Sequence, residues 1–360
     1  MEMERKYFVD RLRWMAILLL FPFHAAQIYS GGEYYGFYIW SHTNMALYAF
    51  STAVYPWYMT LLFVLAGMSC KYALSKRTIK QFIQERTKKL FIPFLFGLLV
   101  LVPIMTYTAN VYFHWYAGTY WQYYPTFFTT FTDLTGYDGG FTPAHLWFLF
   151  YLFIISLIVL PIILLQKKYS ANFQFENISY ICILFMFIPE WLCLYIINIG
   201  GKSLGQFMFL FLIGYFILSN ENVLKKIKQY RWISTIIFIL IGVLYVYLYC
   251  FTSVRHLWMD GLYVAIGWMG IVTMLGIGQS LWNMHRWYDD YWNKASFPIY
   301  IIHMPVLVVI GYFILKFPLG VIGQFSLIVM ISFILTILIY EIIKRIPVLR
   351  FFLGISKQKI

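Results

Sequence analysis

The segment near the N-terminus places an acid, a base and a histidine at helical spacing. Asp10 precedes Arg13 by one turn, and His24 follows Arg13 by eleven positions. Eleven positions are about three turns of an α-helix, so Arg13 and His24 would share one face roughly 16 Å apart, and Asp10 could pair with Arg13. A neutral imidazole can take a proton from a hydroxyl near pH 7. His24 is therefore a candidate general base, or else a packing histidine bonded to a neighbouring helix.

Two further patterns match catalytic signatures only in form. Residues 201–205 (GKSLG) fit GxSxG, but a nucleophile elbow needs a strand-to-helix turn in an α/β sheet. This segment is predicted to join two membrane helices, so Ser203 is not expected to be catalytic. His285 and Asp290 have H-x4-D spacing, in a segment predicted to be a solvated cytoplasmic loop.

No metal site is predicted. The four cysteines lie in apolar runs without the spacing of metal ligands, and we interpret them as small core residues: Cys70, Cys182, Cys193 and Cys250.

The composition excludes a soluble protein. Of the 360 residues, 62% are hydrophobic and only 11% are charged, whereas a soluble chain is about half apolar and about a quarter charged. Too few polar residues remain to cover the surface of a soluble core. The sequence therefore predicts an all-α polytopic membrane protein. The net charge of +13 is explained by basic cytoplasmic loops, and nucleic acid is not expected as a partner.

About ten apolar stretches are long enough to cross a bilayer. Their approximate cores are residues 12–30, 46–70, 90–110, 144–165, 178–199, 204–219, 232–252, 257–280, 296–316 and 318–343. The boundary between the last two rests on Lys316, Pro318 and Gly320.

The distribution of basic residues supports this helix count. If the N-terminus is cytoplasmic and the helices alternate, the outer loops hold only Lys202, Arg255 and Lys316 of the 27 Lys and Arg residues. Positive charge gathers on the inner side of membrane proteins, so both termini are predicted to be cytoplasmic. No linker or shift in composition divides the chain, which is predicted to be one integral membrane domain over residues 1–360.

The outer segment at 111–143 is rich in Trp and Tyr. It also carries Asp133 and Asp138, but no Lys or Arg. Its rings could stack on sugars while the carboxylates bind sugar hydroxyls. The alternative is an aromatic belt at the membrane interface.

Five segments together resemble the membrane acyltransferase-3 family over residues 5–305. The Asp10–Arg13–His24 spacing resembles the family's opening signature, and residues 62–68 (LFVLAGM) are similar to its FFxLSG segment, with Ala66 in place of the usual Ser. The other three similar segments are 85–93 (ERTKKLFIP), 143–149 (PAHLWFL) and 296–305 (SFPIYIIHMP). Within the family, the 143–149 segment is more similar to the subgroup that modifies periplasmic glucans.

The resemblance implies a bacterial plasma-membrane enzyme that moves an acyl group onto a hydroxyl of an extracytoplasmic carbohydrate. Acetyl is the expected group and succinyl the next choice. Within the motif His24, Arg13 and Asp10 would be catalytic, with His24 either a general base or the carrier of a covalent acyl group.

Cytoplasmic acyl-CoA, with acetyl-CoA first, is the expected co-substrate. Its phosphates would meet Arg86, Lys88 and Lys89 together with Arg13, because guanidinium groups suit phosphate geometry. Alternatively, these cations only set the orientation of the helices in the membrane. Along the ninth stretch Ser296, Tyr300 and His303 form one stripe, which could line the passage of the cofactor or make packing hydrogen bonds.

The acceptor is expected to meet Glu33, His145 and Trp147 on the outer side, although a structural role for His145 at a helix end is equally open. The expected partners are the lipid bilayer and the carbohydrate acceptor. A homo-oligomer or a separate extracytoplasmic protein is left open. The rival hypothesis is a transporter of an acyl group or small solute with His24 on its path.

Overall fold

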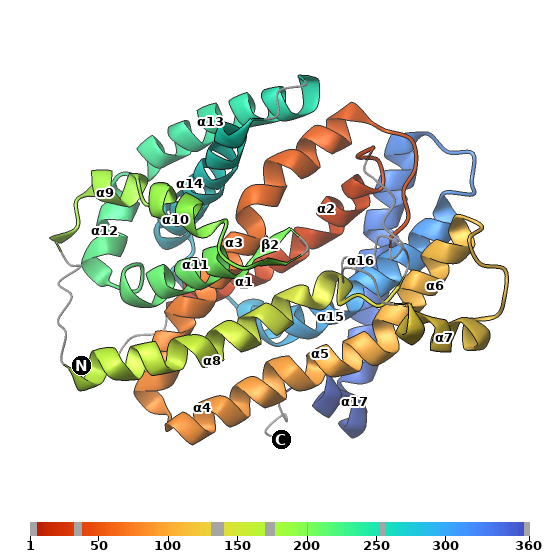
Figure 1. Cartoon of the computed structure of the whole chain (residues 1–360), viewed down its shortest axis with the longest axis horizontal. Helices are drawn as coiled ribbons and strands as arrows, with labels where there is room; N and C mark the ends of the chain where they lie inside the picture. Colours follow the sequence, from red (N-terminus) through yellow and green to blue (C-terminus); the bar gives the residue numbers. More distant parts are fainter. Residues whose placement is uncertain are drawn as a thin grey trace. The chain divides into compact units, whose positions relative to one another are not determined.

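The computed structural model describes residues 6–31, 38–130, 140–169, 177–199, 201–252 and 256–355. Nearly every regular element in these residues is a helix (Figure 1). The only strands described, β1 (Asn198–Ile199) and β2 (Lys202–Ser203), pair as a short antiparallel hairpin. The prediction of an all-α polytopic membrane protein is confirmed.

Contacts between Cα atoms divide the chain into two compact units. The first comprises Met1–Ala16, Thr52–Arg86 and Tyr151–Asn293, and the second comprises Ile17–Ser51, Thr87–Phe150 and Lys294–Ile360. A single functional domain over the whole chain stays a prediction.

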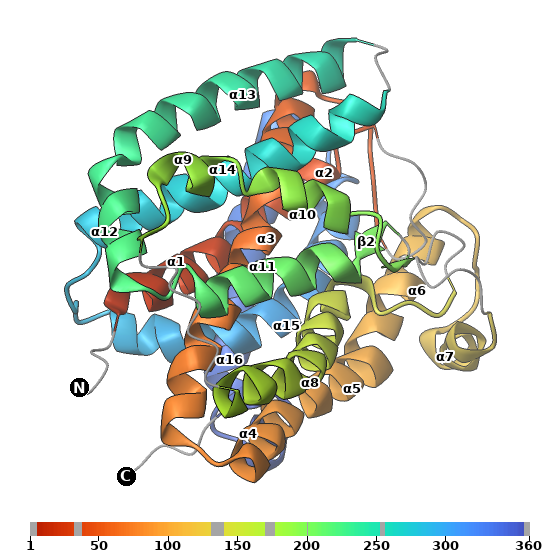
Figure 2. The same cartoon turned by 60° about the vertical axis from the view of Figure 1, so that its left-hand side comes forward.

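The first unit holds most or all of ten helices. They are α1 (Tyr7–Leu18), α3 (Met45–Lys76), α4 (Ile79–Arg86), α8 (Trp147–Lys168), α9 (Tyr180–Leu184), α10 (Phe187–Cys193), α11 (Leu204–Phe216), α12 (Glu221–Gln229), α13 (Arg231–Phe251) and α14 (Leu257–Leu281). Helix α14 is central to this unit, since α10, α12 and α13 all pack on it, and α13 runs beside it in both views (Figures 1 and 2).

The second unit holds the remaining helices. They are α2 (Leu20–Gln27), η1 (Thr87–Phe91), α5 (Ile92–Phe96), η2 (Gly97–Leu101), α6 (Val102–Tyr112), α7 (Tyr120–Thr129), η3 (Ala144–Leu146), most of α15 (Asp289–Ile314), α16 (Val321–Ile343) and α17 (Pro347–Phe352). Within it α2 packs on α16, and α7 packs on α6.

Seven helical segments in the described residues are long and apolar enough to cross a membrane. They become eight if α11 and α12, which are bent by 102°, count as one span. The predicted count of about ten and the cytoplasmic placement of both termini stay predictions. The predicted boundary between the last two stretches is confirmed, because α15 ends at Ile314 and α16 begins at Val321, with Gly320 as its N-cap.

Three predicted segments differ from the structure. The stretch 178–199 is not one helix: α9 ends before Phe185 and α10 begins at Phe187. Pro189 explains the break, since its ring clashes with the carbonyl of residue 185 in a continuous helix. The stretch 12–30 is divided at Leu19, whose backbone angles are still helical. Asp290, expected in a loop, lies in the first turn of α15.

The cysteines were only partly predicted correctly. Cys70 is buried, as a core residue should be, but Cys182 is exposed and Cys193 and Cys250 are intermediate. Cys182 and Ile181 therefore face outward from this unit, whereas Ile183 is buried. In a membrane protein an outward apolar face suits contact with lipid.

Helices α3 and α11 of the first unit approach closely through two glycines. A Cβ added to Gly67 would clash with the backbone oxygen of Phe211, and one added to Gly214 would clash with that of Val64. Such reciprocal small residues let helix backbones pack closely where lipid offers little hydrophobic drive for association.

We expect Gly67→Val to destabilise the protein by about 1–3 kcal/mol or more, because the new side chain meets rigid backbone. Gly323→Ala in α16 is the matched control, since a Cβ there meets only Leu319 at 3.8 Å. Thermal unfolding in detergent measures both variants. Equal unfolding midpoints would show that the α3–α11 approach is not tight.

Candidate functional site

Three histidines from distant parts of the chain gather in the second unit. The ring centroid of His303 lies 5.4 Å from that of His24 and 5.4 Å from that of His145. His303 and His145 are buried, whereas His24 is only partly buried. His24 as a whole residue is therefore the least buried of the three. We call His24, His145 and His303 the imidazole cluster.

His24 lies in the last turn of α2. Its Nδ1 is 2.9 Å from Oε1 of Gln27, three residues further along the helix. The Tyr38 hydroxyl donates a hydrogen bond to the His24 backbone carbonyl, which fixes the end of this helix to the chain that follows. Because an amide oxygen only accepts, Nδ1 carries the proton and Nε2 keeps its lone pair. This is the tautomer that a general base needs.

A proline in α15 creates the binding partner of His145. Pro305 has no backbone N–H, so the carbonyl of Ile301, four residues earlier, lacks its usual helical donor. The His145 Nε2 donates to this carbonyl at 2.9 Å. The missing hydrogen bond of one helix is thus replaced by a side chain from another segment.

The turn that carries His145 is strained. Ala144 has a φ of 44°, in the left-handed region that residues with a Cβ rarely adopt. Such a residue costs about 1–3 kcal/mol and persists only where its surroundings hold it. Here the Ala144 N–H donates to the Thr142 hydroxyl at 3.1 Å, and the Tyr300 hydroxyl donates to the His145 carbonyl. Tyr300 therefore fixes the backbone of His145.

His303 lies in the middle of α15. Its Nδ1 donates to the Tyr300 carbonyl at 2.6 Å, and its ring packs edge-on against Phe21, with centroids 5.6 Å apart. Of the stripe predicted on this helix, Ser296 and Tyr300 are also buried. The structure groups Tyr300 and His303 with His145.

The acid–base pair predicted at the N-terminus lies in the first unit. Arg13 Nη1 is 3.0 Å from Asp10 Oδ1, which confirms the predicted pairing, and Nη2 donates to the Ser69 hydroxyl at 2.6 Å. The Arg13 side chain is 36% exposed, so part of the guanidinium remains open to a ligand. Arg13 belongs to the first unit and His24 to the second. The position of each side chain is therefore given only relative to residues of its own unit.

The other predicted site residues take varied positions. Arg86, at the end of α4, places its guanidinium 4.8 Å from the Phe82 ring centroid. Lys88 and Lys89 are exposed on η1. Trp147 begins α8, where its ring meets Phe148 edge-on, with centroids 6.4 Å apart. Glu33, Asp133 and Asp138 lie outside the described residues.

Ser203 acts as a helix cap. It is the second residue of the short strand β2 and the N-cap of α11, and its hydroxyl is fully engaged. It accepts from the Gln206 N–H at 3.1 Å and donates to the carbonyls of Cys193 and Ile196. A hydroxyl held in this way is no free nucleophile, as the sequence predicts.

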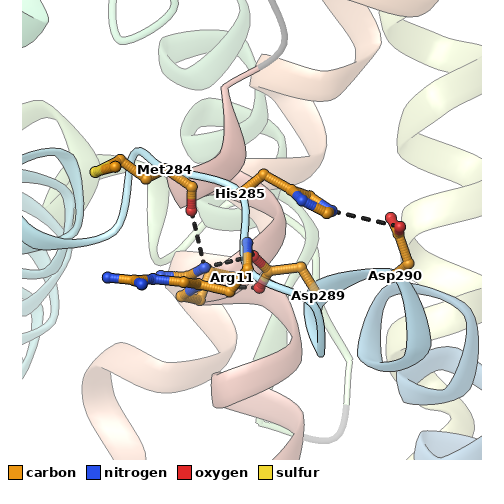
Figure 3. A network of polar contacts seen from close by, with 6 residues as sticks. Arg11, Met284, His285, Asp289 and Asp290 are labelled. Atoms are coloured by element: carbon orange, nitrogen blue, oxygen red, sulfur yellow. Dashed lines mark hydrogen bonds and ion pairs between the residues drawn. The ribbon is translucent and has the colours of Figure 1, made fainter.

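The sequence did not point to Arg11, which forms a buried ion pair with Asp289 in the first unit. Its Nε is 3.0 Å from Asp289 Oδ1, and its Nη2 also bonds the Met284 carbonyl at 3.0 Å. Figure 3 shows the exposed pair of His285 and Asp290 beside it, with Nε2 and Oδ2 3.3 Å apart. The H-x4-D residues therefore do meet, on the surface next to a structural ion pair.

Gln27 and Pro305 were also missed. A polar residue one turn after His24 was a usable signal for Gln27. The role of Pro305 had no sequence signal, because the donor that replaces its N–H comes from a segment about 160 positions earlier.

Comparisons with known proteins give one family. A family model described as "Acyltransferase domain" matches residues 6–341. The chain is 23% identical to glucans biosynthesis protein C of Salmonella schwarzengrund and 24% identical to that of Salmonella typhi, each over 96% of this chain and 94% of the relative. No solved structure matches the chain significantly.

We expect Arg11→Ala to destabilise the protein by about 3–5 kcal/mol, because it leaves the Asp289 carboxylate buried without its partner. Arg13→Ala is the matched control: its ion pair is about a third exposed and should contribute no more than about 1 kcal/mol. Chemical unfolding followed by circular dichroism measures both. Equal losses for the two variants would contradict the assignment of Arg11 as the structural arginine.

Proposed function

The chain belongs to the acyltransferase domain family and is a membrane acyltransferase, and from that premise we propose that it moves an acyl group from cytoplasmic acyl-CoA to a hydroxyl of an extracytoplasmic carbohydrate. Acetyl is the proposed group, with succinyl second. The name of the glucan biosynthesis relatives supports a carbohydrate acceptor. In this proposal His24 is the general base.

The observation that carries the proposal is the hydrogen bond between His24 Nδ1 and Gln27. It leaves the Nε2 lone pair of a neutral, partly accessible imidazole free to take a proton. The acceptor hydroxyl loses its proton to Nε2 while its oxygen attacks the thioester carbonyl. The carbon–sulfur bond then breaks, and the thiolate of CoA recovers the proton from His24.

The neighbours of His24 support this role. The ring of His303 lies next to the rings of His24 and His145, and Phe21 packs against one side of His303. A largely buried setting strengthens each hydrogen bond to the reacting group. His145 and Trp147 are proposed on the acceptor side, as the sequence suggests.

The proposed site for the acyl donor is the basic cluster of the first unit, formed by Arg13, Arg77 and Arg86. Arg86 lies close enough to Arg13 and Arg77 for their positive charges to repel. Asp10 and Glu85 each pair with one of these arginines, which leaves excess positive charge. An anion such as the phosphates of CoA would relieve that repulsion.

We expect His24→Ala to lower acyl transfer by about 10²- to 10⁴-fold, the usual contribution of a general base. The assay uses purified protein, labelled acetyl-CoA and glycans from the cell surface. His42→Ala is the control, because His42 is exposed and outside the imidazole cluster. Transfer by His24→Ala at the wild-type rate would eliminate His24 as the base.

Removing one charged contact to phosphate should raise the KM for acetyl-CoA by about tenfold or more in Arg86→Ala. The KM for the acceptor should stay unchanged. Lys228→Ala provides the control, since Lys228 is an exposed cation on α12. An unchanged KM for acetyl-CoA in Arg86→Ala would show that these cations only set membrane orientation.

One observation favours the rival transporter. Helices α11 and α12 are bent by 102°, and discontinuous helices are typical of transporters. Vesicles that take up labelled solute without forming any acylated product would favour transport over acyl transfer.

A further inference from the structure

The imidazole cluster contains two buried nitrogens without a partner. Backbone carbonyls only accept hydrogen bonds, so His145 Nε2 and His303 Nδ1 must both carry protons in their bonds to Ile301 and Tyr300. In a neutral imidazole the other nitrogen then bears a lone pair. Neither His145 Nδ1 nor His303 Nε2 has a hydrogen-bond partner in the described part of the protein.

The cluster therefore presents three lone pairs and no donor. His24 Nε2, His145 Nδ1 and His303 Nε2 are all acceptors in these tautomers. Acceptors cannot satisfy one another, and a buried polar atom without a partner is costly. A ligand that satisfies these nitrogens must therefore donate hydrogen bonds.

The residues around the imidazole cluster limit which kind of hydrogen-bond donor can bind there. In the described residues no three His, Cys, Asp or Glu side chains are arranged to hold a metal ion. Among the described residues, the rings that pack against this group are uncharged, with Phe21 against His303 and Phe148 against Tyr300. Without a carboxylate among these neighbours to balance a cation, a neutral O–H group fits better than an ammonium.

We infer that the unpaired nitrogens of His145 and His303 bind an O–H donor beside His24, either the hydroxyl of the acceptor or a water that takes its place. The inference rests on the proposed function and adds its acceptor-binding residues. His303 and His145 hold the oxygen by accepting hydrogen bonds, and His24 takes the proton that is transferred. A site built to accept from O–H discriminates strongly against ligands without one.

One consequence of this inference is slow hydrolysis of acyl-CoA when a water takes the place of the acceptor hydroxyl. Water loses a proton to His24 Nε2, and its oxygen forms a bond to the thioester carbon. The carbon–sulfur bond breaks, and the thiolate of CoA takes the proton back. The products are a free carboxylic acid and CoA thiol.

The test uses the full chain in proteoliposomes with labelled acetyl-CoA, once without acceptor and once with glycans from the cell surface. His303→Phe keeps a ring of similar shape but removes the lone pair. His303→Gln keeps an acceptor oxygen near the former Nε2 position. Leu307→Val changes the buried packing of the same helix without removing an acceptor. Unfolding midpoints show that each variant is folded.

We expect His303→Phe to lower both acetate release and transfer to glycan by about tenfold or more, the loss of one hydrogen bond from a buried group. His303→Gln should recover most of each rate, and Leu307→Val should stay within about threefold of wild type. Loss of transfer alone would assign the site to the acceptor hydroxyl, and loss of acetate release alone would assign it to water.

The inference is overturned if His303→Phe retains both rates, or if His303→Gln is no better than His303→Phe, since the ring would then serve packing only. Its failure is distinct from that of the proposed function. If His24→Ala is fully active while His303→Phe is impaired, the base is wrongly assigned but the hydroxyl-binding pair stands. A wild type that neither releases acetate nor transfers it overturns both.

Discussion

The imidazole cluster depends on a hydrogen bond that α15 cannot make by itself. Pro305 leaves the Ile301 carbonyl without its helical donor, and His145 Nε2 supplies the replacement. This contact ties η3 to α15 and determines which nitrogen of His145 carries the proton. Since a buried carbonyl without a donor is costly, the pairing is favourable for both segments. His145 is thereby brought next to His303.

The chemistry of the cluster follows from how each ring is held. Gln27, Ile301 and Tyr300 each accept from one ring nitrogen, and so each ring is left with one acceptor nitrogen. Side chains that donated to the histidines would have produced the opposite tautomers. The difference between a proton-accepting and a proton-donating site thus lies in which partners the rings meet, rather than in the histidines themselves.

Two arginines on one short helix show the same dependence on surroundings. Arg11 is buried against Asp289, whereas Arg13 is partly exposed against Asp10. The buried pair holds α1 to the start of α15 within the first unit, whereas the Arg13 side chain of the other pair is 36% exposed. Residues two positions apart on a helix point in different directions, so neighbouring arginines can serve structure and ligand binding separately.

The sequence by itself determined the class of protein, most of the helices, the separation of the last two and the family. These follow from local properties: runs of apolar residues, proline and glycine at helix ends, and short motifs in order. It also identified His24, His145 and His303 one by one and predicted the pairing of Asp10 with Arg13, since both lie within one helical turn.

Only the tertiary structure decided that the three histidines meet, which nitrogens they leave free and that Arg11, not Arg13, is the buried arginine. It also gave Ser203 a capping role. Hydropathy and spacing describe a segment and its nearest neighbours in the chain. The partners of His145, Arg11 and Ser203 lie in other segments, and a contact between segments is set by how helices pack, which no local pattern encodes.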